Sequence, residues 1–261
     1  MKSIHIITVT LALFFGIHST QAEGIHVNPR LQKVEVPLDA VLAPYHGYDN
    51  TNNIEVVLHG NLPNTCYQLD EYTLEKDPVT HTIRIHQFAT KKLDGVCGEE
   101  NALPEHFTML VPFTNVASLG ILPAGDYTIK YDDDTYHSGQ KSLNVKVAHK
   151  TTVDDYPYAS VSGISTSDVV QKNDKLSATL SGVLTSSCSY LDTDNIKIEK
   201  QKDVYVVLPI LKMKLGVMCI QTLIPFMHTI ELEAPKEQGN YLIQVRSMNG
   251  KSVNRVVSAI E

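Results

Sequence analysis

The sequence contains no tryptophan among its 261 residues. Because tryptophan is a common platform for stacking against sugar rings, its absence weakens a carbohydrate-binding role without excluding one. The sequence also lacks a Gly-x-Ser-x-Gly elbow, a His-Glu-x-x-His helix and a glycine loop that could cradle phosphate. No segment keeps the helical hydrophobic period long enough to form an amphipathic helix. We expect at most a single helical turn, at residues 99–105 or 168–174. We therefore expect a protein that is not an enzyme and needs no cofactor.

Basic residues are also few. The chain carries 22 Lys and Arg against 29 Asp and Glu, a net charge of −7. Proteins that bind nucleic acids or anionic membranes usually display a basic surface. We therefore expect no nucleic-acid partner and no membrane insertion, and we expect the partner to be a protein or a cell-surface glycan.

Long apolar runs are absent except near the N-terminus. Lys2 precedes an apolar stretch at residues 6–17, and Thr20 and Ala22 place small residues at the two positions that a signal peptidase reads. The stretch is shorter than the roughly 20 apolar residues of a membrane-spanning helix. The pattern predicts a signal peptide at residues 1–22, cleaved after Ala22, and a mature bacterial protein that is periplasmic or secreted.

The four cysteines form two pairs at one repeated offset. Cys66 and Cys188 lie 122 positions apart, as do Cys97 and Cys219. The residues around the first cysteine of each pair follow the same frame. In that frame, positions 58, 60, 62, 66 and 69 are identical to positions 180, 182, 184, 188 and 191, in the order Leu, Gly, Leu, Cys, Leu. Such self-similarity predicts a duplicated domain.

These cysteines could form disulfides or bind a metal. Zinc sites usually contain two ligands separated by two to four residues, whereas the cysteines within each pair here are 31 positions apart. An exported chain favours disulfides, and four cysteines allow three pairings. The duplication selects Cys66 with Cys97 and Cys188 with Cys219, one internal disulfide in each copy.

Short segments with period-two alternation dominate both copies. In residues 82–86, Ile83 and Ile85 share one face while polar residues share the other. Polar residues at 150–157 separate two such series, so we expect a first domain at 23–149, a linker at 150–157 and a second domain at 158–261, joined stiffly because the linker is short. The predicted strands span residues 32–38, 54–59, 80–87, 107–113, 126–131 and 142–148 in the first copy, and 158–164, 176–180, 196–200, 204–208, 226–233, 241–246 and 252–259 in the second.

A Gly-x-Tyr motif stands near the end of each copy, as Gly125-Asp126-Tyr127 and Gly239-Asn240-Tyr241. With the short strands and turns, these motifs make the mature chain resemble bacterial immunoglobulin-like or fibronectin-III-like domains. The resemblance implies an all-β fold of two tandem immunoglobulin-like antiparallel β-sandwiches, and a role in binding or scaffolding. Cys66 and Cys188 follow predicted strands, so we do not expect the inter-sheet disulfide of antibody domains.

Histidines and acidic residues offer an alternative function, metal binding. The candidate zinc or copper ligands lie on or near strands of the first copy and are His59, His81, His86 and His106. The candidate calcium ligands are Asp132-Asp133-Asp134 and Asp154-Asp155, neither of which has the Asp-x-Asp-x-Asp-Gly order of a calcium loop. The other interpretation is solvated histidines on strand faces and carboxylates that cap turns.

The copies differ most between their cysteines. Residues 70–96 carry basic and histidine side chains, whereas residues 192–218 include the strongly apolar segment 204–211. We therefore expect a non-catalytic binding or structural module whose contact surface lies in one inter-cysteine segment or at the domain junction. The apolar run at 204–211 also fits a buried central strand.

Overall fold

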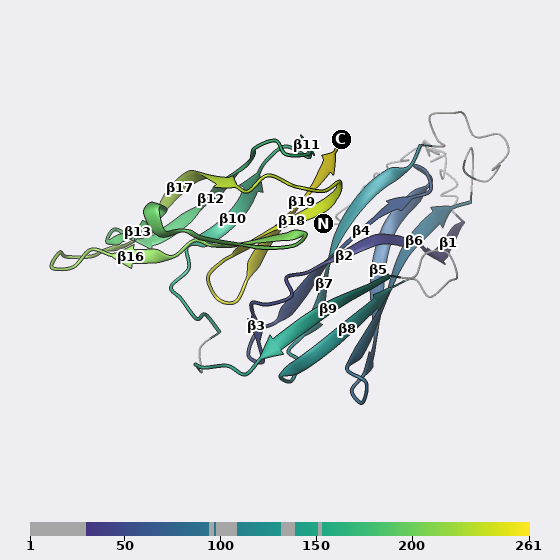
Figure 1. Ribbon diagram of the computed structural model, residues 1–261, viewed down its shortest axis with the longest axis horizontal. Coiled ribbons are helices and arrows are strands. Elements are labelled where there is room, and N and C mark those ends of the chain that lie inside the picture. The colour runs from purple at the N-terminus through teal and green to yellow at the C-terminus, as the bar shows by residue number, and fades with distance from the viewer. Residues whose placement is uncertain (1–29, 94–96, 98–108, 132–138, 151–152) are drawn as a thin grey trace, which may run out of the picture.

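The computed structural model describes residues 30–93, 97, 109–131, 139–150 and 153–261 (Figure 1). These residues form β-strands, loops and a short 3-10 helix at Thr193–Asn195. One hydrophobic core forms within residues 36–145 and a second within residues 159–259, each between two sheets. The all-β sandwich architecture expected from the sequence is confirmed at this level. The predicted signal peptide lies outside the described residues.

The N-terminal half packs a three-stranded sheet against a six-stranded one. The smaller sheet has the order β2-β4-β7, and the larger has the order β1-β6-β8-β9-β3 with β5 also paired to β6. The strands are β1 (Leu31–Glu35), β2 (Leu38–Leu42), β3 (Tyr48–Asp49), β4 (Ile54–Leu62), β5 (Tyr67–Asp77), β6 (Thr82–Lys92), β7 (Val111–Gly120), β8 (Gly125–Tyr131) and β9 (Gly139–Lys146).

The C-terminal half has sheets of the orders β10-β12-β17 and β11-β19-β18-β15-β14, with a small β13-β16 pair. Its strands are β10 (Ser160–Ser165), β11 (Val169–Gln171), β12 (Leu176–Ser186), β13 (Ser189–Leu191), β14 (Lys197–Gln201), β15 (Val204–Leu208), β16 (Leu211–Met213), β17 (Gln221–Leu232), β18 (Gly239–Arg246) and β19 (Ser252–Ile260). β11 replaces the helical turn expected at residues 168–174.

The two halves share one strand order. β2-β4-β7 corresponds to β10-β12-β17, and β3-β9-β8-β6-β5 corresponds to β11-β19-β18-β15-β14. The first residues of β4 and β12 are Ile54 and Leu176, and those of β6 and β15 are Thr82 and Val204, so both strand pairs keep the offset of 122 seen in the cysteines. The duplication therefore extends from a few identities to most of the strand topology, while β1 and the β13-β16 pair have no counterpart in the other half among the described strands.

The larger sheets are mixed, which corrects the expectation of purely antiparallel sheets. β6 runs parallel to β8, and β15 runs parallel to β18. Parallel neighbours need a crossover connection, and here the chain passes from β6 to β8 through β7 in the opposite sheet. Sequence alternation reports which face a residue occupies and carries no information on strand direction, so it could not reveal this feature.

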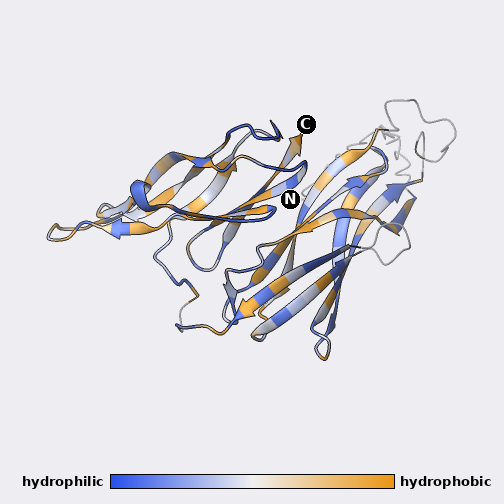
Figure 2. Cartoon of the chain, in the orientation of Figure 1, coloured by the Kyte–Doolittle hydropathy of each residue, from blue (hydrophilic) through white to orange (hydrophobic). Residues whose placement is uncertain are grey.

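Alternation along the strands fills the cores as predicted. Ile83 and Ile85 of β6 are buried, while the intervening Arg84 is only partly covered. Figure 2 shows the same alternation of hydrophobic and hydrophilic residues along several strands of both sandwiches. The period-two pattern thus identified the buried faces correctly.

The two Gly-x-Tyr motifs form the same local structure. Tyr127 Oη donates a hydrogen bond to the carbonyl oxygen of Pro123 at 3.0 Å, and Tyr241 Oη donates one to that of Glu237 at 2.9 Å. Gly239 has a φ of +144°, a conformation that side-chain-bearing residues rarely adopt. In each half the tyrosine therefore ties the strand that it opens to the preceding loop.

Both disulfides join cysteines within one half. Cys66 is bonded to Cys97 and Cys188 to Cys219, with Cα–Cα distances of 5.6 and 5.4 Å. This is the pairing that the duplication predicts. Formed disulfides are compatible with an extracytoplasmic protein. In the described part of the chain, no helix has the length and apolar character required to traverse a bilayer.

The two sandwiches meet through a buried apolar contact. On β18, Tyr241, Ile243 and Val245 face the core of the C-terminal half. The intervening Leu242 faces the other way, into a third buried cluster that we call the junction cluster. Its buried members come from both halves of the chain and are Leu42, Val57, Val204, Val206 and Leu242.

Polar contacts extend this junction. Gln244 Nε2 donates a hydrogen bond to Tyr48 Oη at 2.8 Å, and Lys141 Nζ pairs with Asp203 Oδ1 at 2.7 Å. These polar groups lose part of their hydration at the junction. The cost is offset because each one hydrogen-bonds or pairs with a group of the other half. The packed junction therefore gives a second reason, beside the short linker, to expect a stiff tandem.

We predict that Leu242→Ala lowers the free energy of unfolding by about 2–5 kcal/mol, because it opens a cavity in the junction cluster. Denaturant titration followed by circular dichroism measures this change. The matched control is Leu223→Ala, since Leu223 is 70% exposed and its truncation should alter stability by no more than about 0.5 kcal/mol. Equal effects of the two substitutions would contradict a buried junction.

We also predict that replacing both Cys188 and Cys219 with serine destabilises the C-terminal half by about 2–5 kcal/mol, because the unfolded chain loses the constraint of a closed loop. Denaturation of the variant measures the loss. Non-reducing peptide mapping of the native protein provides the control, and a bridge between Cys66 and Cys188 would refute the independent pairing.

Candidate binding surface

The structure separates the candidate histidine ligands. His59 lies on β4, His81 lies in the turn before β6, and His86 lies on β6. The His81 ring stacks on Tyr127 with a centroid distance of 4.8 Å, and His86 Nδ1 lies 2.7 Å from Glu35 Oε1. Each histidine thus has its own local role rather than a place in a common metal site.

The acidic candidates at the junction support turns. The two carboxylate oxygens of Asp154 accept hydrogen bonds from the backbone amides of Asn249 and Gly250, both at 2.7 Å, and Asp155 accepts one from Tyr158 Oη. Among the residues that the structure describes, no group of three His, Cys, Asp or Glu side chains is arranged to hold a metal ion. His106 and Asp132–Asp134 lie outside the described residues.

Among the candidate ligands that the structure describes, His59 is the one whose burial lowers the pKa of its side chain. Loss of hydration lowers the pKa of its imidazole, and this effect exceeds the opposing influences of the Asp39 carboxylate and a hydrogen bond to the Phe113 backbone. Its Nδ1 atom is buried without a hydrogen-bond partner in the described structure. The ring is therefore neutral at pH 7, and protonation opposes folding.

We predict that the free energy of unfolding falls as the pH drops below about 6.5, because the unfolded state then binds a proton that folded His59 does not. NMR titration should place the His59 midpoint below the unfolded value, and His59→Gln should flatten the pH dependence of stability. A midpoint at or above the unfolded value would contradict this account.

The apolar segment that begins at Val204 is a buried central strand. β15 lies between β14 and β18. Tyr205 and Val207 face the core of the C-terminal half, whereas Val204 and Val206 belong to the junction cluster. Of the two interpretations of residues 204–211, the structure supports the buried strand for β15. Residues 204–207 are therefore not an exposed surface.

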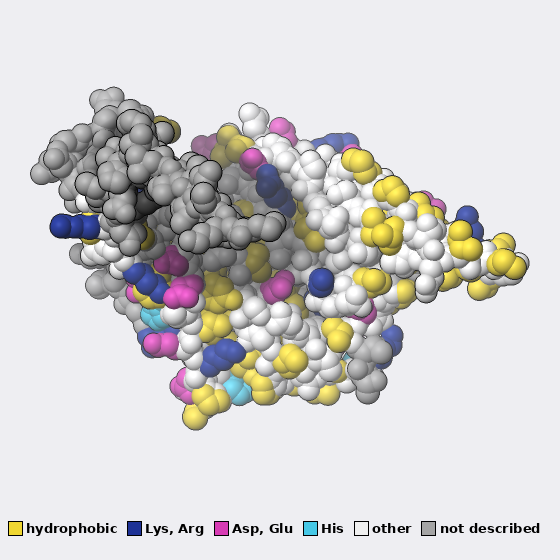
Figure 3. All heavy atoms as spheres, turned by 180° about the vertical axis from the view of Figure 1, so that it is seen from behind, with side chains coloured by type: hydrophobic (Ala, Val, Ile, Leu, Met, Phe, Trp, Pro, Cys, Tyr) yellow, Lys and Arg dark blue, Asp and Glu magenta, His cyan; other side chains and the backbone are white. Residues whose placement is uncertain are grey.

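Large apolar side chains are exposed together at the free end of the C-terminal half. Figure 3 shows hydrophobic side chains gathered at the narrow end of the molecule, the end where Figure 1 places β13 and β16. Leu215 is 91% exposed and Met218 is 93% exposed. We call this surface the apolar tip and define it by Met213, Leu215, Val217, Met218, Ile220 and Leu223, together with Met227, which lies further along β17 opposite Ser181. A contiguous exposed apolar surface usually marks an interaction site.

Covalent and polar contacts hold the base of the apolar tip. The Cys188–Cys219 disulfide joins its two sides, and the backbone amide of Lys214 donates to the carbonyl oxygen of Cys188 at 2.9 Å. Lys212 Nζ lies 2.6 Å from Asp192 Oδ2, and this pairing lowers the pKa of the Asp192 carboxyl. The exposed side chains are therefore presented by a supported loop.

The outer edge of β17, beside the apolar tip, is less suited to binding a partner than the apolar side chains of the tip are. β17 ends the order of its sheet, so its outer edge could pair with an added strand. Pro225, opposite Val183 within β17, has no amide hydrogen to donate. The apolar side chains, rather than a continuous row of backbone donors, distinguish this surface.

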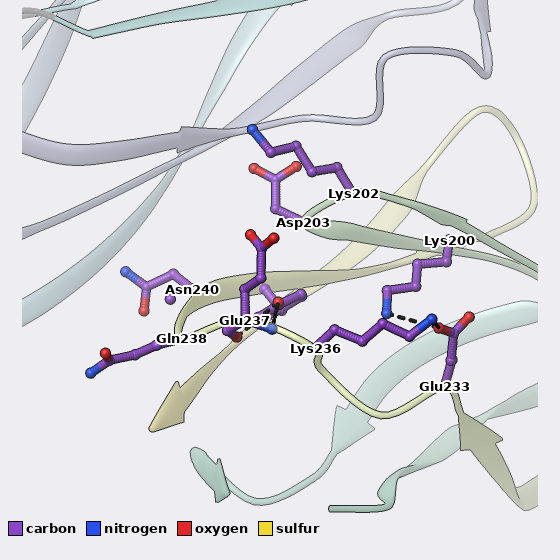
Figure 4. Close-up of a pocket in the computed structure, with 10 residues that line it drawn as sticks. Lys200, Lys202, Asp203, Glu233, Lys236, Glu237, Gln238 and Asn240 are labelled. Atoms are coloured by element: carbon purple, nitrogen blue, oxygen red, sulfur yellow. Dashed lines mark hydrogen bonds and ion pairs between the residues drawn. The ribbon is translucent and has the colours of Figure 1, made fainter. Parts of the chain in front are cut away.

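A charged groove of about 490 Å³ lies beside the loop between β17 and β18. In Figure 4, Lys200 and Lys236 converge on Glu233, whose Oε1 lies 3.3 Å and 3.1 Å from their Nζ atoms. The two ammonium groups lower the pKa of the Glu233 carboxyl. This carboxylate is ionised at neutral pH, so it is unsuited to act as a general acid.

Comparison with known proteins supports the fold of the N-terminal half. A family model described as the ORF11 beta-sandwich domain matches residues 56–143. The matched range begins within β4 and ends within β9. No curated protein and no solved structure matches the chain. The similarity therefore identifies a class of β-sandwich and assigns no reaction, substrate or partner.

The sequence analysis placed the expected contact surface in one inter-cysteine segment or at the domain junction and did not predict which side chains are exposed. The expected inter-cysteine segment 192–218 includes Met213, Leu215 and Met218, but the tip continues beyond it to Met227. The available signal was composition, because residues 204–230 contain no Asp or Glu. That composition is shared by the buried β15 and the exposed tip, so it cannot separate them.

Proposed function

We propose that this protein is an extracytoplasmic, non-catalytic binding module that contacts a partner protein through the apolar tip. The observation that carries the proposal is the clustering of exposed Leu, Met, Val and Ile side chains at one end of the molecule. Monomeric proteins rarely leave such a surface in water without a function. We also propose that the two sandwiches are tandem immunoglobulin-like domains. The repeated topology and the two Gly-x-Tyr motifs support this assignment.

The tip is well suited to bind because it is pre-organised. Burying one such Leu or Met side chain contributes about 1.5–3 kcal/mol. The Cys188–Cys219 disulfide restricts the loop before any partner arrives, which reduces the entropy lost on binding. Several tip residues acting together can therefore offset the cost of association.

The chemistry of the tip favours a protein over a glycan. The residues that define it are all aliphatic or methionine, and Tyr190 on the adjoining β13 is only 40% exposed, so the tip presents apolar chains rather than a platform of rings on which a sugar could stack. Met213, Met218 and Met227 are unbranched and polarizable, and methionine-rich surfaces adapt to varied apolar partners. We therefore assign the partner an exposed apolar patch of its own.

Site-specific crosslinking tests this assignment. With p-benzoylphenylalanine in place of Met218, the full chain should crosslink to a small set of proteins in an extracytoplasmic extract of the producing cell. Unlabelled wild-type protein should compete, whereas a Leu215→Ser/Met218→Ser/Met227→Ser variant should compete at least about tenfold less well, corresponding to the loss of one or more buried side chains.

Val79 provides the matched control, because it is 89% exposed in the turn between β5 and β6, away from the tip. The same crosslinker at Val79 should capture none of these proteins. The proposal fails if the triple variant competes as well as wild type. It also fails if the Met218 probe reacts with lipid vesicles and not with proteins, since the tip would then be a membrane contact.

A further inference from the structure

A cleft of about 380 Å³ opens at the junction of the two halves, and none of the residues that define the apolar tip lines it. Its walls come from the β3 region, the end of β9 with the following loop, and the end of β18. We call it the junction cleft and define it by Tyr48, Asn52, Lys146, His149, Lys150 and Arg246. Both halves of the chain therefore contribute side chains to one site.

Arg246 is the central charge of the junction cleft. It is only 9% exposed, and its Nη2 donates to the carbonyl oxygen of Gly47 at 2.8 Å and to Asn52 Oδ1 at 3.1 Å. Its guanidinium also lies 5.1 Å from the centre of the Tyr48 ring. These partners are all neutral, and no carboxylate among the described residues forms an ion pair with Arg246. A buried arginine usually has an anionic partner.

Two lysines add positive charge at the same cleft. Lys150 Nζ donates to the backbone carbonyl oxygen of Asp155 at 2.7 Å, which leaves its charge uncompensated by a carboxylate. Lys146 is exposed at the end of β9, and within the described structure it too has no ion-pair partner. In an acidic chain, three cations without ion-pair partners among the described residues thus line one concave site, together with the carboxylates of Asp49 and Asp155.

The carboxylates that line this cleft are engaged by neutral donors. Asp49 Oδ1 accepts hydrogen bonds from the backbone amide and the hydroxyl of Thr51 at 2.9 and 2.6 Å. Asp155 Oδ1 accepts one from Tyr158, and burial raises the pKa of that phenol, so its hydroxyl keeps the proton that it donates. These contacts orient both acidic side chains toward structural partners within the loops.

We propose that the junction cleft binds a phosphate-type oxyanion, either free phosphate or the phosphate group of a small organic molecule. The planar guanidinium of Arg246 and the ammonium groups of Lys146 and Lys150 are the donors that recognise such a group. The site is independent of the apolar tip and does not require the proposed protein partner.

Calorimetric titration of the full chain with inorganic phosphate and with glycerol 3-phosphate tests the proposal, in a buffer whose ionic strength is held constant with sodium chloride. Wild type should bind saturably, and Lys146→Ala/Lys150→Ala should weaken binding by about tenfold or more because two charge-assisted contacts are lost. Both lysines are exposed, so the variant should fold; circular dichroism checks this. In amide NMR spectra, phosphate should shift the signals of Gly47 and Asn52.

The matched control is Lys172→Ala/Lys175→Ala, which removes two exposed lysines from the turn after β11 and should leave binding unchanged. Tighter binding of glycerol 3-phosphate than of phosphate would assign the site to an organic ligand, and equal binding would assign it to the anion alone. The proposal is overturned if neither anion binds beyond the sodium chloride control. It is also overturned if both double variants lose affinity equally, because that result indicates general charge screening.

Discussion

The arrangement of this molecule depends on β18 being buried on both of its faces. Tyr241, Ile243 and Val245 complete the core of the C-terminal sandwich, while Leu242 seals the junction cluster against the N-terminal half. Gln244 and Arg246 follow Leu242 on the same face and reach Tyr48 and Gly47 of the other half. One short strand therefore stabilises a domain, joins it to its neighbour and supplies the central cation of the junction cleft.

Duplication explains how one framework supports two different surfaces. Both halves repeat the strand order, the disulfide and the hydrogen bond from a tyrosine hydroxyl to the backbone four residues earlier. These shared features maintain the packing of each sandwich. Val204 and Val206 of β15 and Leu242 of β18 cover the junction, while residues from Met213, at the end of β16, onward form the apolar tip. The C-terminal copy thus presents apolar residues at two places, and only one of them is covered by the chain itself.

Much of the fold could be predicted because it rests on local patterns. Ile83 and Ile85 alternate with polar residues, and the cysteines recur at one offset, so the buried faces and the disulfide pairing could be inferred. The parallel pairing of β6 with β8 could not, because it depends on how the chain crosses between sheets. The candidate sites were harder to predict from the sequence than the fold. His59 lies on β4, whereas His81 and His86 lie just before and on β6 in the other sheet, so each has a separate environment.

By itself, the sequence determined an all-β chain with two duplicated halves, two internal disulfides and a strongly apolar segment after residue 203. Those properties follow from the spacing of residues along the chain, which the sequence displays directly. Only the tertiary structure decided that Val204 and Val206 are covered while Leu215 and Met218 are exposed, and that Arg246 lies in a cleft with Lys146 and Lys150. The physical reason is that solvent exposure and charge pairing depend on which distant segments pack together. Residues of similar hydrophobicity therefore differ in solvent exposure. Those that lie against the other sandwich are buried, and those at the free end are exposed.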